Sequence, residues 1–248
     1  MKTIQEAHTL WFKQEKFAFI YVPKVACTSW KLFFLRILFR DYPKKITYQN
    51  IHSRNDIPLP YLIDMPPEEK KLFETMLHRK EIKVVGVIRD PKQRVLSAYL
   101  DKIYYHRNPK SLFSQVIIPE IRNYCQCSET QRPSFGDFLR WVNSQNSKNC
   151  NNNHWLPMTK IFGGLLNGHV DLQLYPMVKM KEAVRVVQSH FNSKTPFPTT
   201  SALGPRKINN TEGINHTNYY GEEESKIFNA IYAEDIEMYR RINDENKC

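Results

Sequence analysis

Short apolar runs alternate along this chain with longer amphipathic segments. Residues 17–22 (FAFIYV) and 83–88 (KVVGVI) are continuous apolar runs of the length expected for strands buried on both faces. Each run is followed by a segment with helical periodicity, over 28–40 and about 90–105. Residues 46–52 (ITYQNIH) alternate weakly and predict a further strand between the two strand–helix pairs.

The rest of the chain continues this alternation. A last strand is predicted over 170–179, and Pro176 places it at an edge of the sheet because proline cannot donate to a ladder. Further helices are predicted over 66–80, 134–142, 181–191 and about 221–242. Strands that alternate with helices predict an α/β fold of three layers, with a mostly parallel central sheet and helices on both faces.

The sequence shows no repeat, low-complexity tract or linker. We therefore expect one domain over 1–248, with its core at about 17–240. Polar residues dominate 107–133, which we interpret as an irregular insertion over the face that carries the candidate site. Loops are also predicted over 143–153 and 193–218.

The charge of the chain constrains its partners. It carries 36 Lys and Arg against 25 Asp and Glu, a formal net charge of +11. Such a surface favours an anionic partner: a nucleic acid, membrane headgroups, acidic sugars or a polyphosphate. The basic residues are spread along the chain without a basic arm or recognised module, so no nucleic-acid partner is expected. A basic soluble protein without an anionic partner is the alternative.

Five cysteines are too few for a disulfide scaffold, and their odd number means that at least one is a free thiol or pairs with another chain. Cys125 and Cys127 form a C-x-C pair, which is compatible with a strained disulfide or with two thiols. No second pair accompanies them, so no zinc site is expected.

The first strand-to-helix connection is a candidate anion site. The run FAFIYV ends at Pro23, and Lys24 precedes small residues and the hydroxyls of Thr28 and Ser29. Helix N-termini present unpaired backbone N–H groups and the positive end of the helix dipole, which together bind phosphate or sulfate. The glycines and the lysine position of a Walker A loop are missing. An ordinary turn with a Thr or Ser cap is the alternative.

The second connection has the same order. Arg89 follows the run 83–88, and Ser97 lies about two helical turns later. Asp90 is a candidate N-cap, with Gln93 three residues later as in a capping box. An arginine fork and a hydroxyl can hold a second phosphate, and ligands of open α/β sheets bind beyond the carboxyl ends of the strands. A purely structural ion pair of Arg89 is the alternative.

The two connections read V-P-K-V-A-C-T-S-W-K and V-I-R-D-P-x-x-R-x-x-S-A-Y-x-D-K. They resemble the motifs of sulfotransferases, most closely the carbohydrate sulfotransferase family that includes the Golgi chondroitin and dermatan 4-O-sulfotransferases and their bacterial relatives. The stretches SFGDFLRWV, HWLP and the tyrosine-rich end extend the resemblance from about Phe17 to Tyr239. It implies a P-loop-like sulfotransferase fold. It also implies transfer of a sulfuryl group from 3′-phosphoadenosine-5′-phosphosulfate (PAPS) to a hydroxyl group, leaving 3′-phosphoadenosine-5′-phosphate (PAP).

The resemblance also implies roles for single residues. Lys24 would contact the oxygen that bridges phosphate and sulfate, while Arg89 and Ser97 would hold the 3′-phosphate. Arg206 and Lys207, in a late loop, could close over the nucleotide or belong to a solvated charged loop. The residues that would surround the 5′-phosphate are Val25, Ala26, Cys27, Thr28 and Ser29.

Transfer to a hydroxyl group needs a base, and histidine titrates near neutrality. His52 lies between the two phosphate motifs, in the interval where related sulfotransferases often place their catalytic histidine. His154 is the rival, as a base or as a residue that positions the acceptor. No metal is expected, because lysine, arginine and helix dipoles can stabilise the developing charge.

The acceptor is expected to be a carbohydrate, with the insertion 107–133 on its side of the site, and the net charge would suit an anionic glycan. The main alternative is a nucleotide-dependent kinase or nucleotide-binding protein on a similar sheet. A nucleic-acid-binding protein and an inactive sulfotransferase fold are weaker alternatives. The oligomeric state is not predicted by the sequence.

The expected location depends on whether the chain is complete. The amino-terminal segment MKTIQEAHTLWFKQEK lacks the apolar core of a signal peptide. No apolar run reaches the length of a membrane span. We expect a cytoplasmic location for a complete chain, and the Golgi lumen if the chain is part of a longer protein.

Overall fold

A computed structural model describes residues 4–39, 42, 45–47, 50–106, 108–145, 152–198 and 216–245. The chain divides into two compact units, and each is described by itself. The first, which we call the sheet unit, is formed by residues 1–89, 158–205 and 241–248. The second, which we call the helical unit, is formed by residues 90–157 and 206–240. The expectation of a single domain stays a prediction.

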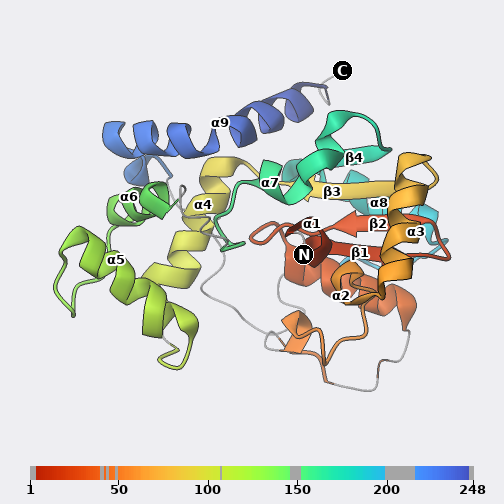
Figure 1. Ribbon diagram of the computed structural model, residues 1–248, viewed down its shortest axis with the longest axis horizontal. Helices are drawn as coiled ribbons and strands as arrows, with labels where there is room; N and C mark the ends of the chain where they lie inside the picture. Colours follow the sequence, from red (N-terminus) through yellow and green to blue (C-terminus); the bar gives the residue numbers. More distant parts are fainter. Residues whose placement is uncertain are drawn as a thin grey trace. The chain divides into compact units, whose positions relative to one another are not determined.

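The sheet unit is built on four strands in the order β1-β2-β3-β4 (Figure 1). Strand β1 (Thr9–Phe12) runs antiparallel to β2 (Phe17–Ile20). The pairs of β2 with β3 (Lys83–Ile88) and of β3 with β4 (Leu172–Pro176) are parallel. The predicted α/β class and mostly parallel sheet are therefore confirmed, and Pro176 lies on an edge strand as expected. Strand β1 was not predicted.

Helices pack on both faces of this sheet. The helices of the sheet unit are α1 (Ile4–His8), α2 (Cys27–Leu38), α3 (Pro67–His78), α7 (Met158–Phe162) and α8 (Met180–His190). On one face, the ring of Phe19 in β2 lies 4.5 Å from Trp30 and 5.0 Å from Phe34 of α2. On the other, a Cβ added to Gly86 would come within 2.8 Å of Phe162 in α7. This glycine lets α7 approach the sheet closely.

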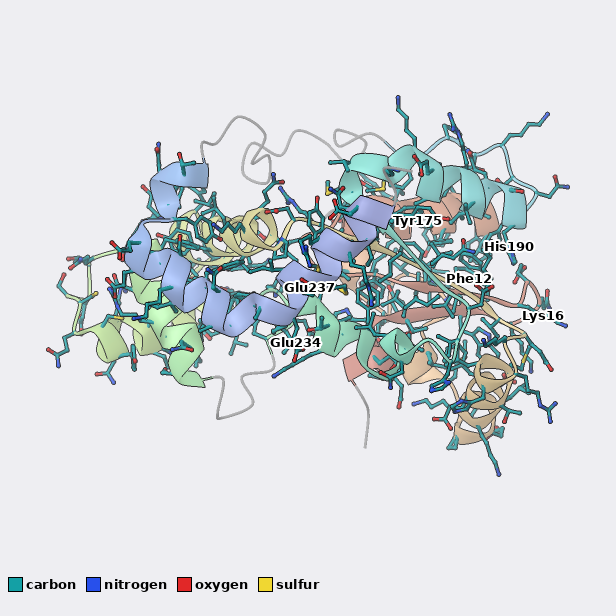
Figure 2. The ribbon with its side chains drawn as sticks, turned by 90° about the horizontal axis from the view of Figure 1, so that it is seen from above. Phe12, Lys16, Tyr175, His190, Glu234 and Glu237 are labelled. Atoms are coloured by element: carbon teal, nitrogen blue, oxygen red, sulfur yellow. The ribbon has the colours of Figure 1, made fainter. Side chains whose placement is uncertain are left out.

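At one end of the sheet, helix α8 contacts the hairpin formed by β1 and β2. Phe12, Lys16 and His190 lie together there (Figure 2). Nε2 of His190, the last residue of α8, is 2.6 Å from the carbonyl oxygen of Glu15. Its ring also lies 4.8 Å from that of Phe17. Helix α8 is thereby tied to the hairpin turn.

The strand predicted over 46–52 is wrong. The described end of this segment is a 3₁₀ helix, η1 (Asn50–His52). Asn50 Oδ1 accepts a hydrogen bond of 2.7 Å from the N–H of Thr47, and Asn50 N–H donates to Thr47 Oγ1 at 3.2 Å. Such local side-chain bonds compete with a strand ladder. The other 3₁₀ helices of this unit are η2 (Leu62–Asp64), η6 (Gly163–Asn167) and η7 (Met177–Lys179).

The helical unit has its own apolar core, with Trp155, Phe138, Phe228 and Tyr232 buried in it. Tyr232 Oη donates to the carbonyl oxygen of Trp155 at 2.6 Å, and helix α9 is kinked at this tyrosine (φ −116°). The α-helices are α4 (Pro91–Tyr99), α5 (Ile118–Cys125), α6 (Phe135–Gln145) and most of α9 (Glu222–Glu245). Two π-helices, η3 (Leu100–Tyr104) and η4 (Phe113–Ile117), and one 3₁₀ helix, η8 (His216–Tyr219), join them.

The interpretation of 107–133 as irregular is wrong, because η4 and α5 occupy much of it (Figure 1). Ile117, Ile118 and Ile121 are buried in the core of the helical unit. Their i, i+1 and i+4 spacing gives a helix one apolar face among exposed polar residues. Pro119 fits the first turn of α5, where a missing N–H costs nothing.

The predicted helices over 66–80, 134–142, 181–191 and 221–242 correspond to α3, α6, α8 and α9. The predicted cap is present too, because Asp90 Oδ1 accepts from Gln93 N–H at 2.9 Å at the start of α4. Among the described residues, no helix is both long and apolar enough to cross a membrane. The location of the protein stays a prediction.

Candidate functional site

The turn between β2 and α2 has an unusual backbone. Lys24 (φ 68°) and Ala26 (φ 51°) are both left-handed, and neither is glycine. Left-handed residues interspersed with others turn successive backbone N–H groups toward one side, which forms a concave site for an anion. Val25 between them is buried and anchors the turn, and its N–H donates to the carbonyl oxygen of Val22 at 3.2 Å.

Helix α2 begins at Cys27 without a side-chain cap. Its N-cap residue is Ala26, so neither Thr28 nor Ser29 caps the helix as the ordinary-turn alternative required. These hydroxyls lie in the first turn of the helix instead. The N–H groups of an uncapped first turn can donate to the oxygens of a phosphate or sulfate.

His52 lies against this helix start. Its Nε2 is 2.9 Å from Oγ1 of Thr28, and its side chain is exposed. The contact joins η1 to α2 within the sheet unit. The histidine favoured from the sequence and the first anion-binding motif are thus side by side.

Arg89 reaches the same turn from the end of β3. Its Nη1 donates to the carbonyl oxygen of Lys24 at 3.2 Å, and its side chain is half-buried. The parallel pairing of β2 and β3 brings their carboxyl ends to one edge, which accounts for this meeting. The two residues from separate motifs are therefore brought together in the sheet unit.

The other predicted residues belong to the helical unit or lie outside the described residues. Ser97 lies in α4 and is only 3% exposed. His154 Nδ1 is 2.9 Å from Asn152 Oδ1, and its ring meets that of Phe113 edge-on. Arg206 and Lys207 are outside the described residues, so their role stays a prediction.

Arg94, one turn before Ser97, has a structural task. It is fully buried, and its guanidinium donates to the carbonyl oxygens of Leu156 at 2.8 Å and Asn153 at 3.2 Å. These two carbonyls flank His154. Arg94 therefore fixes the segment that carries this histidine.

Lys31 was not singled out from the sequence, although it is the one charged residue in the apolar stretch WKLFF. It is 4% exposed, and its Nζ lies 4.3 Å from the ring centre of Tyr21 and 5.1 Å from that of Tyr61. Burial is the main reason why the pKa of Lys31 is lowered to about 8; the nearby Cys27 opposes this shift, and Arg54 adds a smaller lowering effect. Helix α2, which begins at the anion-binding turn, therefore carries a buried cation one helical turn after Cys27.

The cysteines of the C-x-C pair are free thiols, which excludes the strained disulfide. Burial, followed by the carboxylate of Asp137, raises the pKa of both Cys125 and Cys127. In the described ranges, no group of three or more His, Cys, Asp or Glu side chains is arranged to hold a metal ion. The expectation of a metal-free site stays a prediction.

Comparison with known proteins supports the resemblance. The sequence model of the Sulfotransferase family matches residues 7–243. Carbohydrate sulfotransferase 14 of Mus musculus and of Homo sapiens are 29% and 28% identical to this chain over 152 residues. The protein of the same name from Danio rerio is 29% identical over 154 residues. No solved structure matches the chain.

These alignments cover 61% of this chain and 38% to 40% of the relatives, so the chain spans less than half of their length. The family match is much broader, because it takes in both the anion-binding turn and the late helix α9. The resemblance read from the two motifs is confirmed: the chain belongs to the sulfotransferase family.

Proposed function

We propose that this protein transfers a sulfuryl group from PAPS to a hydroxyl group of a carbohydrate. Family membership and the relatives named as carbohydrate sulfotransferases support this reaction class. One observation carries the proposal: the turn that bears Lys24 is in contact with Arg89 on one side and, through Thr28, with His52 on the other. A cation, an arginine fork and a candidate base therefore meet at one helix N-terminus.

The residues of this turn fit the anionic part of such a nucleotide. The left-handed Lys24 and Ala26 and the uncapped start of α2 supply backbone donors. The methyl side chain of Ala26 leaves the backbone open to close approach. Lys24 adds a positive charge, and its proposed task is to stabilise the charge that develops on the leaving phosphate.

When bound, PAPS supplies an activated sulfuryl group, and its transfer forms a bond between sulfur and the acceptor oxygen while the bond from sulfur to the phosphate oxygen breaks. His52 is proposed to take the acceptor's hydroxyl proton at Nε2. In this structure Thr28 Oγ1 lies 2.9 Å from that same nitrogen, so the acceptor hydroxyl must replace Thr28 as the partner of Nε2 before the proton moves. His154 remains the rival base.

Arg89 and Ser97 are proposed to hold the 3′-phosphate. Arg89 presents a planar fork that suits the oxygens of a phosphate. Ser97 is only 3% exposed. Its hydroxyl can therefore contact a ligand only where α4 reaches the surface, or after a local rearrangement of the structure around it. Arg89 is therefore the better residue for a first test.

The experiment is a thermal melt of the full chain with PAP, AMP or ATP plus magnesium. A ligand that binds only the folded state at a hundredfold excess over Kd stabilises it by about 2.7 kcal/mol. We expect strong stabilisation by PAP, little by AMP, and loss of the PAP effect in Arg89→Ala. Arg79→Ala, which removes an exposed arginine at the end of α3, is the matched control and should keep the effect.

Two results would contradict the proposal. Stabilisation by ATP with magnesium but not by PAP would favour the kinase alternative. If no nucleotide shifts the melt, the turn does not bind a nucleotide. If PAP stabilises the protein as expected, the next step is to measure sulfate transfer from labelled PAPS to a panel of oligosaccharides.

A further inference from the structure

The helical unit contains a small basic pocket that the proposed reaction does not use. It has a volume of about 160 Å³. Arg122 of α5 and Arg132 of the following loop line it, together with His106 and Ser114. Its apolar lining consists of Ile103, Ile118 and Pro133. We call this cavity the arginine pocket.

Among the described residues, neither of the two arginines that line the pocket forms an ion pair with a carboxylate. The printed hydrogen bond of Arg122 uses Nε, which donates to the carbonyl oxygen of Gln131 at 2.7 Å. Arg132 stacks on the ring of Tyr104, with 5.7 Å between the guanidinium carbon and the ring centre. Two positive charges therefore converge on one cavity without a compensating carboxylate of their own.

The walls of the arginine pocket are held in place. Tyr99 Oη donates to the carbonyl oxygen of Pro133 at 2.9 Å in a buried hydrogen bond. The hydrogen bond from Arg122 holds Gln131 in the same way. The loop is therefore held on both sides of Arg132. Side chains held in advance lose little conformational entropy on binding a ligand.

The chemistry of this lining suits an anion that offers at least two free oxygens. Guanidinium forks pair with carboxylate and sulfate through two parallel N–H bonds. Ser114 contributes a hydroxyl, and Ile103, Ile118 and Pro133 form the apolar part of the lining. The volume is well below the roughly 300 to 1,000 Å³ of sites that enclose drug-sized ligands, so it suits one charged substituent.

Aromatic side chains beside the pocket favour a sugar as the carrier of that substituent. Tyr104 and Tyr105 are each 38% exposed, and their rings meet edge-on at 4.8 Å. Exposed tyrosines offer a flat apolar face and a polar tip, which suits the mixed surface of a sugar ring. A long nucleic-acid backbone would instead need an extended basic groove.

We infer that the arginine pocket binds a carboxylate or sulfate substituent of the sugar that the enzyme modifies. The inference rests on the proposed function for the identification of that sugar as the acceptor. The pocket then acts as a specificity site: it holds a charged substituent of the acceptor and takes no part in the transfer itself.

The test measures binding of defined oligosaccharides to the full chain by calorimetry, without any nucleotide. The probes are a tetrasaccharide that contains hexuronate, its carboxyl-reduced neutral form, a sulfated neutral tetrasaccharide, and inorganic sulfate. We expect a charged tetrasaccharide to bind at least about tenfold more tightly than the neutral form, which is the scale of one charge-assisted hydrogen bond. The hexuronate and sulfated probes show which of the two substituents is preferred.

Two variants locate the binding. Arg132→Gln removes the guanidinium that stacks on Tyr104, and Arg122→Gln/Arg132→Gln removes both guanidinium groups of the pocket. We expect the charged probe to lose about tenfold in affinity in the first and more in the second. Lys226→Gln/Arg240→Gln removes two exposed charges from α9 and should bind like the wild type. Unchanged melting temperatures in PAP-free buffer check that the variants fold.

Each outcome distinguishes a failure of the pocket proposal from a failure of the proposed function. Arginine-dependent binding of a charged tetrasaccharide supports the pocket, even if PAP fails to bind and the proposed function falls. Binding of PAP with oligosaccharide affinity that does not depend on the arginines overturns the pocket and leaves the function standing. Equal affinity for inorganic sulfate and the sulfated sugar shows a free-anion site, and it overturns the assignment to a sugar.

Discussion

The sheet unit and the helical unit each present a candidate anion site, and they build it from different atoms. In the sheet unit, the turn at Lys24 and Ala26 relies on backbone N–H groups in left-handed conformations. In the helical unit, the arginine pocket relies on the side chains of Arg122 and Arg132. A backbone site depends on the conformation of the chain, whereas a side-chain site depends on the identity of two residues.

This difference matches a division of labour. A ligand that is the same in every turnover can be held by main-chain donors, which most substitutions leave in place. A partner that distinguishes one enzyme from another is better read by side chains, because they can change without disturbing the fold. The two proposals together place the common chemistry in the sheet unit and the choice of acceptor in the helical unit.

The largest expected effect is a fall in kcat, which distinguishes a residue that takes part in the transfer step from one that only binds the acceptor. Replacing His52 with alanine removes the proposed base, so kcat should fall by about 100- to 10,000-fold. The KM for the acceptor should change little, and the fall in rate at low pH, where a base is protonated, should disappear from the pH profile. Steady-state kinetics with labelled PAPS measures both quantities.

His154→Ala is the control for that prediction. It removes the rival histidine from the helical unit, where Asn152 and Phe113 contact it. If this variant loses kcat and His52→Ala does not, the base belongs to the helical unit and the division of labour is wrong. A variant of Arg132, by contrast, should raise KM with little change in kcat.

The second prediction concerns the buried cation behind the turn. Lys31 has a folded-state pKa of about 8, against 10.5 for an unburied lysine. Between these values the unfolded chain holds more protons than the folded one, so this lysine makes the free energy of unfolding rise with pH. Below about pH 8 its buried charge costs up to about 3 kcal/mol, and above about 10.5 that cost is gone.

Chemical denaturation of wild type and Lys31→Met over this pH range tests the prediction. The stability of the wild type should rise relative to the variant between about pH 8 and 10.5. Arg132→Gln is the matched comparison from the other site, because an arginine stays charged throughout and should give no such slope. Parallel curves for wild type and Lys31→Met would show that Lys31 is not held in a desolvated site.

The smallest expected effect addresses the backbone directly. Ala26→Val places a β-branched side chain at φ 51°, a conformation that such residues strongly disfavour. Binding of PAP should weaken by about tenfold, since strain of this kind costs on the order of 1 to 3 kcal/mol. Ala26→Gly keeps the conformation accessible and should bind like the wild type in calorimetry. Equal affinities for the two variants would mean that the left-handed turn is not needed for binding.

Sequence reasoning performed best where structure is local. The connections of β2 to α2 and of β3 to α4 were recognised because strand, turn and helix follow one another within about twenty residues. The characteristic residues of each motif also lie close together in the sequence. The cap formed by Asp90 and Gln93 was predicted for the same reason. The partners of these residues lie within a few positions in the sequence.

It failed where a competing local hydrogen-bond pattern, or side chains from distant segments, decide the structure. Residues 46–52 alternate like a strand, but hydrogen bonds between Thr47 and Asn50 close a helical turn. The apolar face of α5 is short and surrounded by polar residues, so its burial shows only in the folded unit. Lys31 resembles a surface lysine until Tyr21 and Tyr61, ten and thirty positions away, cover it. The arginine pocket requires the chain to return on itself between 103 and 133.

The hairpin of β1 and β2 has a consequence for the order in which the protein can fold. Four residues, 13–16, separate these strands, so their pairing closes a small loop and can form as soon as residues 9–20 are available. Pairing of β2 with β3 joins residues more than sixty positions apart. On its own such a two-stranded ribbon is at best marginally stable, and one edge of β2 stays open until β3 pairs with it. The contact between Arg89 and Lys24 must wait until β3 arrives, which makes the anion site a late product of folding.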